Sequence, residues 1–182
     1  MTGKAETNGV TKEMRICLEA NRRGRLSTGQ WLDIVTEPLT PALLLMLPAI
    51  VIFGPRLLTL LRWLPVIILL VIALIIVPLV FRARRYARGA LRFAVLETRS
   101  GLSPRWMFWK RPEFTASDGK TLRFAKRLVS HMPLQRGRAY LVYYLDDPGG
   151  LVLLSLVTAD HPDSERWRPS EDFKRRGGVI VP

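Results

Sequence analysis

A run of eighteen residues, Leu64 to Phe81, contains no charged and no hydrogen-bonding side chain, which limits how this chain can fold. It reads LPVIILLVIALIIVPLVF. About twenty such residues span the hydrocarbon core of a bilayer as an α-helix. The rest of a 182-residue chain is too small to wrap an all-round apolar helix of that length. We therefore predict a membrane-spanning helix over residues 60–81, with Arg62 and Trp63 at the interface.

A second apolar segment precedes this run, at residues 39–54, and it contains Pro41 and Pro48. Prolines are tolerated inside a membrane helix when neighbouring groups satisfy the freed carbonyls. The pattern predicts a first span, and the alternative is a re-entrant or interfacial segment. The link between the segments is short, so two spans would be antiparallel. The expected fold class is therefore an α+β membrane protein with a two-helix transmembrane hairpin over residues 38–81.

The distribution of charge predicts an orientation for this hairpin. The formal net charge is +13, and a basic cluster of five arginines without an acid follows the apolar run. Because Lys and Arg favour the cytoplasmic flank of a span, we expect a multi-pass protein of the bacterial inner (plasma) membrane with both termini cytoplasmic. Each base near anionic lipid headgroups gains about 1 kcal/mol. We therefore predict that residues 82–90 are a basic juxtamembrane linker and that this cluster anchors the chain to the bilayer: Arg82, Arg84, Arg85, Arg88 and Arg92.

Residues 1–37 are expected to form a cytoplasmic helical hairpin. Apolar residues recur at helical spacing before Gly24, a candidate left-handed helix cap. Ser27 and Gln30 have the spacing of a capping box that opens a second helix. The segment LEANRRGRLSTGQ resembles short helical-hairpin modules at the ends of many bacterial membrane proteins. This resemblance implies a role in oligomerisation or partner contact, although Gly29 and Gln30 stand where those modules carry acids.

From residue 91 to 158 the pattern changes to the alternation of β-strands, with hairpin turns at Asp118-Gly119 and at residues 146–150. Five strands with a short helix between the third and fourth is the order of an OB-fold barrel. An SH3-like barrel or an open sheet packed on the helix is the alternative. Residues 159–182 are expected to be a flexible tail. The predicted core consists of Phe93, Val95, Phe114, Leu122, Phe124, Leu128, Tyr140, Val142, Leu153 and Leu156.

The second half of this domain resembles the tail of uncharacterised small bacterial two-span membrane proteins with a C-terminal β domain. Their pattern is a short helix followed by G..Y.VYY.P.S..LLS.E. The chain departs from it at Asp146-Asp147-Pro148 and at Leu156. The resemblance implies an architecture and brings no activity. The matching residues are Gly137, Tyr140, Val142, Tyr143, Tyr144, Leu153, Leu154 and Ser155.

No catalytic motif occurs in the sequence: it has no P-loop, GxGxxG, GxSxG or HExxH. The single cysteine, Cys17, excludes a disulfide within the chain. His161, flanked by Asp160 and Asp163, is expected in a solvated polar loop rather than in a metal site. We therefore predict that the protein is not an enzyme and has no catalytic residue, metal or cofactor.

The segment RWMFWK offers the aromatic residues that lack an assigned role. Alternation in a strand places Trp106 and Phe108 on one face and Trp109 on the other, so one of the two faces has no role in the core. We therefore take these three residues as the candidate partner face. We predict a non-catalytic accessory or scaffolding protein that binds a protein partner, or a second copy, through its β domain. The alternative is a membrane-tethered binder of nucleic acid or an anionic ligand through the OB-like domain. Nucleic acid is disfavoured because lipid headgroups already account for much of the positive charge.

Overall fold

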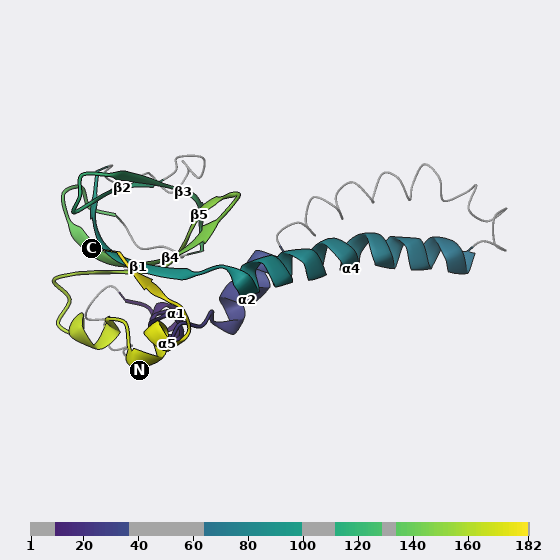
Figure 1. The fold of residues 1–182 in the computed structure, drawn as a ribbon, viewed down its shortest axis with the longest axis horizontal. Coiled ribbons are helices and arrows are strands. Elements are labelled where there is room, and N and C mark those ends of the chain that lie inside the picture. Colours follow the sequence, from purple (N-terminus) through teal and green to yellow (C-terminus); the bar gives the residue numbers. More distant parts are fainter. Residues whose placement is uncertain (1–9, 37–63, 100–111, 129–133, 182) are drawn as a thin grey trace, which may run out of the picture. The chain divides into compact units, whose positions relative to one another are not determined.

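A computed structural model describes residues 10–36, 64–99, 112–128 and 134–181 (Figure 1). The chain divides into two compact units. The first, which we call the barrel unit, comprises residues 1–30 and 89–182. The second comprises residues 31–88 and includes helix α4 (Leu64–Arg88).

The barrel unit is built on a closed five-stranded β-barrel, as expected for an OB-like domain. Its strands are hydrogen-bonded in the order β2-β3-β5-β4-β1, and pairing of β1 with β2 closes the barrel. β3 and β5 are parallel and the other neighbours are antiparallel. The helix expected between the third and fourth strands falls largely on residues 129–133, outside the described residues. The strands are β1 (Leu91–Thr98), β2 (Glu113–Ala116), β3 (Thr121–Arg127), β4 (Ala139–Asp147) and β5 (Gly150–Thr158).

Two tight turns set the hairpins of this barrel, and both use glycine at positive φ. Gly119 has φ +78° in the β2–β3 turn, where Asp118 Oδ1 accepts a hydrogen bond from the Lys120 N–H at 2.9 Å. Gly150 has φ +120° at the start of β5, and an added Cβ would lie 2.7 Å from Ala125 Cβ. The second turn therefore requires glycine for both backbone conformation and space.

Aromatic side chains fill the barrel interior. Phe114 makes edge-to-face contacts with Phe124 and Tyr140, at ring-centroid distances of 5.4 and 6.4 Å. Phe124 contacts Tyr144 at 5.6 Å. The core prediction was wrong for Val95, which is 44% exposed, because Ala94 and Leu96 on either side point inward. Leu122 and Leu128 are half-buried, and the other seven predicted core residues are buried.

A second layer, which we call the terminal layer, covers the outer face of part of the barrel. It combines α1 (Lys12–Arg22), the 3-10 helix η2 (Glu165–Trp167), α5 (Glu171–Arg175) and β6 (Val179–Ile180). α1 packs against β5, and β6 pairs in parallel with β1. The expected flexible tail at 159–182 was therefore wrong: Trp167 and Phe173 are only 4% and 0% exposed. The free energy gained by burying these two large rings offsets the conformational entropy that the segment loses when it becomes ordered.

Side chains link the two ends of the chain to each other and to the barrel. Asn21 Nδ2 donates to Ser155 Oγ at 2.7 Å, and Gln30 Nε2 donates to the Leu154 carbonyl at 2.8 Å. Ser170 donates from both its N–H and its hydroxyl to the Arg22 carbonyl, at 3.0 and 2.9 Å. These contacts satisfy buried polar groups across the layer boundary.

The local signals of the N-terminal segment are confirmed. Gly24 ends α1 with φ +71°. The capping box opens α2 (Thr28–Thr36): the Ser27 N–H donates to Gln30 Oε1 at 3.0 Å, and the Gln30 N–H donates to Ser27 Oγ at 3.3 Å. Gln30 therefore has two roles, because it completes the capping box of α2 and also donates a hydrogen bond to β5.

The predicted transmembrane hairpin is not supported. Within the described ranges, no helix combines the length and the apolar character needed to cross a bilayer. α4 has 25 residues, but its apolar part ends at Phe81 and four arginines occupy the remainder. The multi-pass inner-membrane localisation was therefore wrong as an inference from the apolar run. The other expected span, residues 39–54, lies outside the described residues.

Candidate interaction surfaces

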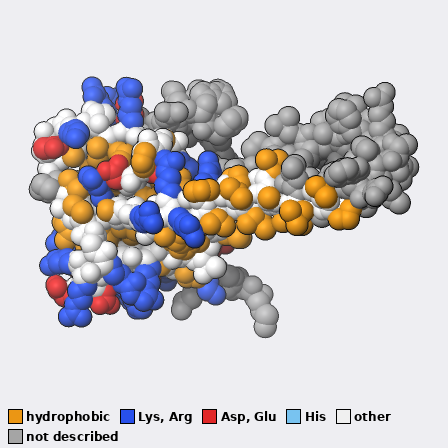
Figure 2. Space-filling model, turned by 45° about the vertical axis from the view of Figure 1, so that its right-hand side comes forward, with side chains coloured by type: hydrophobic (Ala, Val, Ile, Leu, Met, Phe, Trp, Pro, Cys, Tyr) orange, Lys and Arg blue, Asp and Glu red, His pale blue; other side chains and the backbone are white. Residues whose placement is uncertain are grey.

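α4 exposes a broad apolar surface (Figure 2). At about 100° per residue the exposed apolar side chains cover roughly 200° of the helix circumference. An amphipathic helix of a globular protein instead has an apolar stripe somewhat wider than about 100° and a polar opposite face. The exposed residues are Val66, Leu69, Ile72, Leu74, Ile76, Val77, Val80 and Phe81.

The predicted basic cluster is divided between two elements. Its first four arginines lie in the C-terminal part of α4, where cations also interact favourably with the helix dipole. Arg92 lies in β1 instead, where its Nη2 is 2.6 Å from Asp146 Oδ2. This ion pair assigns Arg92 a role within the barrel. No acid occurs in the sequence from Leu64 to Leu96.

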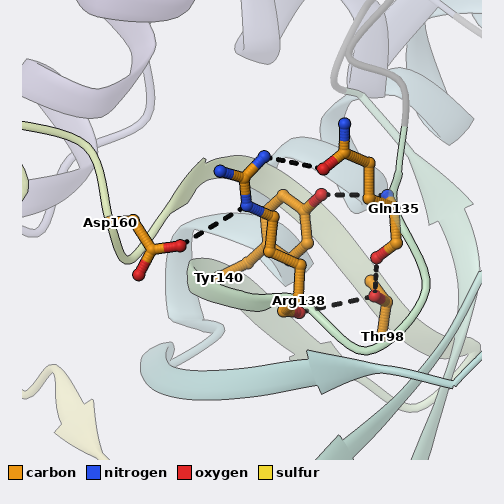
Figure 3. Close-up of polar contacts among 5 residues, drawn as sticks. All are labelled: Thr98, Gln135, Arg138, Tyr140 and Asp160. Carbon is orange, nitrogen blue, oxygen red and sulfur yellow. Dashed lines mark hydrogen bonds and ion pairs between the residues drawn. The ribbon is translucent and has the colours of Figure 1, made fainter.

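A polar network joins residues from three segments of the barrel unit (Figure 3). The Thr98 hydroxyl donates to the Gln135 carbonyl, and the Gln135 N–H donates to the Tyr140 hydroxyl at 3.0 Å. Arg138 donates to Gln135 Oε1 at 2.7 Å and approaches Asp160 Oδ2 at 3.4 Å. These contacts join the end of β1, the segment before β4 and the segment after β5. These interactions hold the three segments together, which is a structural role.

The outer face of β2 and β3 is the surface on which OB-fold proteins commonly bind nucleic acid. Here its exposed members include Arg123, whose Nε lies 2.7 Å from Glu113 Oε1, and Ala125. Every described aromatic residue of the five strands is buried, so these strands expose no stacking platform. The candidate partner face at Trp106, Phe108 and Trp109 lies outside the described residues.

The aromatic contacts of the terminal layer centre on Tyr143. Its ring lies 5.0 Å from that of Phe93 and 5.9 Å from that of Phe173, and its hydroxyl donates to the Trp167 carbonyl at 2.7 Å. Burial raises the pKa of Tyr143 far above its ordinary value, and the nearby Arg22 lowers it in part. This phenol is therefore protonated and structural at neutral pH.

His161 is buried, which corrects the expectation of a solvated loop. It is 5% exposed and its ring lies 4.7 Å from that of Trp167. Its Nδ1 accepts a hydrogen bond from the Asp163 N–H at 3.1 Å. Among the residues that the structure describes, no three His, Cys, Asp or Glu side chains are grouped to hold a metal ion. The contacts give this histidine a packing role against Trp167.

An open groove of about 650 Å³ lies between α1, the loop that follows it and the segment around η2. Its lining includes four arginines, two acids and the apolar side chains of Ile16, Leu26 and Trp167. The sequence did not indicate this groove, because it joins residues from opposite ends of the chain. The charged lining residues are Arg15, Glu19, Arg23, Arg25, Asp163 and Arg166.

Comparison with protein-family models, with curated proteins and with solved structures found no match to this chain.

Proposed function

We propose that this chain is a non-catalytic anchoring and scaffolding protein. Through α4 it associates with a lipid surface that bears anionic headgroups, and it presents the barrel unit to a protein partner. The observation that carries this proposal is the exposed apolar surface of α4, followed directly by arginines. The lack of catalytic motifs in the sequence supports the non-catalytic part.

The width of the apolar surface favours lipid as the occupant. A partner helix would cover a stripe of about 100°. Lipid chains can contact apolar side chains around a much wider arc, such as the roughly 200° exposed on α4. Each buried methylene contributes about 0.8 kcal/mol, so contact with several of these side chains is a large gain.

The charge of α4 favours anionic headgroups. Arg84 and Arg88 are exposed at the end of the apolar part. Each base near an anionic lipid surface contributes about 1 kcal/mol, and screening by salt reduces that gain. α4 therefore combines an apolar surface with adjacent basic residues, the combination by which interfacial helices bind anionic lipid.

Flotation of the full chain with vesicles tests the lipid association. We expect more protein to float with phosphatidylglycerol vesicles than with phosphatidylcholine vesicles, and the difference to shrink at high salt. Arg84→Gln with Arg88→Gln should weaken binding to phosphatidylglycerol by roughly tenfold or more, given about 1 kcal/mol per base. The matched control, Arg136→Gln with Arg175→Gln, removes the same charge from the barrel unit and should change little.

The apolar part is tested separately by Leu69→Asn with Leu74→Asn, two residues that are 71% and 63% exposed. This variant should lose binding to both kinds of vesicle while the barrel unit stays folded. Equal binding by all variants, or binding only to a soluble protein, would overturn the lipid association. Salt-sensitive binding of a single-stranded oligonucleotide in place of vesicles would support the nucleic-acid alternative instead.

A further inference from the structure

The groove beside α1 is lined by residues that do not take part in the packing of α1 on the barrel. Met14, Leu18 and Asn21 form the buried side of α1 and face the barrel. The groove is lined instead by the side that carries Arg15, Ile16, Glu19, Ala20 and Arg23. α1 is thus fixed by one side and free to present the other.

Three arginines in the groove have charge to offer a ligand. Arg15, Arg25 and Arg166 are exposed, and none forms an ion pair with another described residue. Arg23 differs, since its Nη2 lies 2.8 Å from Glu19 Oε1. The three come from α1, the loop after it and η2, so they surround the groove rather than follow one helix.

Apolar surface accompanies this charge. Ile16 is 56% exposed, Leu26 is half-buried, and the buried Trp167 contributes to the lining. An exposed isoleucine between arginines fits a ligand that combines carboxylates with an apolar side chain.

The same lining disfavours nucleic acid. Glu19 and Asp163 would repel a phosphate backbone, which is charged at every unit, whereas an acidic peptide that also carries apolar residues can place those residues beside them. The one aromatic residue of the lining, Trp167, is 4% exposed and gives bases no surface to stack on.

We infer that this groove binds an acidic peptide segment of a partner protein, with its carboxylates on Arg15, Arg25 and Arg166 and an apolar side chain on Ile16. The arginines can each hold a carboxylate by two parallel hydrogen bonds. This inference rests on the partner-binding part of the proposed function and not on its lipid part.

The test uses the full chain and a fluorescent peptide of repeated Glu-Glu-Leu units, with fluorescence anisotropy as the readout. The triple substitution Arg15→Glu, Arg25→Glu and Arg166→Glu should weaken binding by about tenfold or more, because charge-assisted contacts become repulsive. The matched control is Lys120→Glu, Arg136→Glu and Arg175→Glu, which changes net charge equally at exposed sites outside the groove. It should bind within about twofold of the unaltered chain.

Further measurements sharpen the result. Ile16→Ser should weaken binding by roughly threefold, and a polyglutamate peptide without leucine should bind less tightly, since both lose apolar contact. Circular dichroism checks that each variant is folded.

Equal loss of peptide binding in the groove and control variants would show that net charge alone causes the effect, and it would overturn the inference. Preferential binding of oligothymidylate over the peptide would also overturn it. Vesicle flotation of the groove variant should be unchanged, so failure here is distinguishable from failure of the lipid association.

Discussion

β4 and α4 are both strongly apolar, yet the structure treats them in opposite ways. Six consecutive residues of β4, from Tyr140 to Leu145, are at most 2% exposed. α4 instead exposes apolar side chains over most of its length. β4 lies between two layers, with the barrel interior on one face and the terminal layer on the other. An unbroken apolar run therefore indicates that an element needs an apolar environment, and not where that environment comes from.

The terminal layer is the reason that β4 can be apolar on both faces. Tyr140 and Tyr144 point into the barrel, whereas Tyr143 contacts Phe173 outside it. The described part of the chain shows no comparable cover over the exposed residues of α4, and we propose that lipid covers them. Paired substitutions in β4's surroundings and in α4 test this difference.

The largest difference is expected for one substitution made in both places. Phe173→Ala removes a ring that is 0% exposed and should lower the free energy of unfolding of the barrel unit by about 3–5 kcal/mol. Phe81→Ala removes a ring that is 68% exposed and should change it by no more than about 0.5 kcal/mol. Hydrogen exchange of the β4 amides measures this stability within the full chain. Similar losses for both variants would contradict the contrast.

A smaller loss is expected for Gly178→Ala. The added Cβ would lie 2.4 Å from two ring carbons of Phe173 and force the terminal layer to shift. We expect a destabilisation of about 1–3 kcal/mol. Gly29→Ala is the control, because nothing lies within 4 Å of its added Cβ and alanine favours the helix. Thermal melting compares the two, and a neutral Gly178→Ala would show that the layer is loosely packed.

The link between α1 and β5 should have a measurable coupling energy. Asn21→Ala and Ser155→Ala each break the 2.7 Å side-chain hydrogen bond, and we expect each to cost about 1–2 kcal/mol. The double variant should cost less than the sum of the singles by roughly 1 kcal/mol, as for a direct contact. Strict additivity in urea unfolding would mean that the two residues do not interact.

The smallest effect concerns the pH dependence of stability. Burial raises the folded-state pKa of Tyr143 above its ordinary value of 10.0. The protonated phenol therefore stabilises the fold fully below about pH 10, and this contribution is lost as the pH rises towards the folded pKa. Tyr143→Phe should cost about 1 kcal/mol at neutral pH through loss of the hydrogen bond to Trp167. The variant should also lose less stability than the unaltered chain between neutral and strongly alkaline pH. Urea unfolding at both pH values checks this, and parallel losses would refute the role of Tyr143.

Much of the fold could be predicted from the sequence where the signals are local. The Asp118-Gly119 turn, the capping box at Ser27 and Gln30, and the succession of strands along the chain each depend on residues that are close in sequence. The terminal layer was missed because it depends on contacts across the chain, such as Arg22 with Ser170. One signal was available: β4 and β5 are apolar at successive positions, which is typical of strands buried on both faces. The groove could not be predicted, since no local pattern brings Arg15 near Arg166.

The most direct test of the central claim places the same environment-sensitive probe in the two regions. In a Cys17→Ser background, a nitrobenzoxadiazole label is attached through Leu74→Cys on α4 or through Val95→Cys on the barrel, positions that are 63% and 44% exposed. With phosphatidylglycerol vesicles that carry a lipid-bound quencher, association of α4 with lipid predicts a blue shift and strong quenching at position 74 and neither at position 95. Equal responses at the two positions, or no response at position 74, would contradict it.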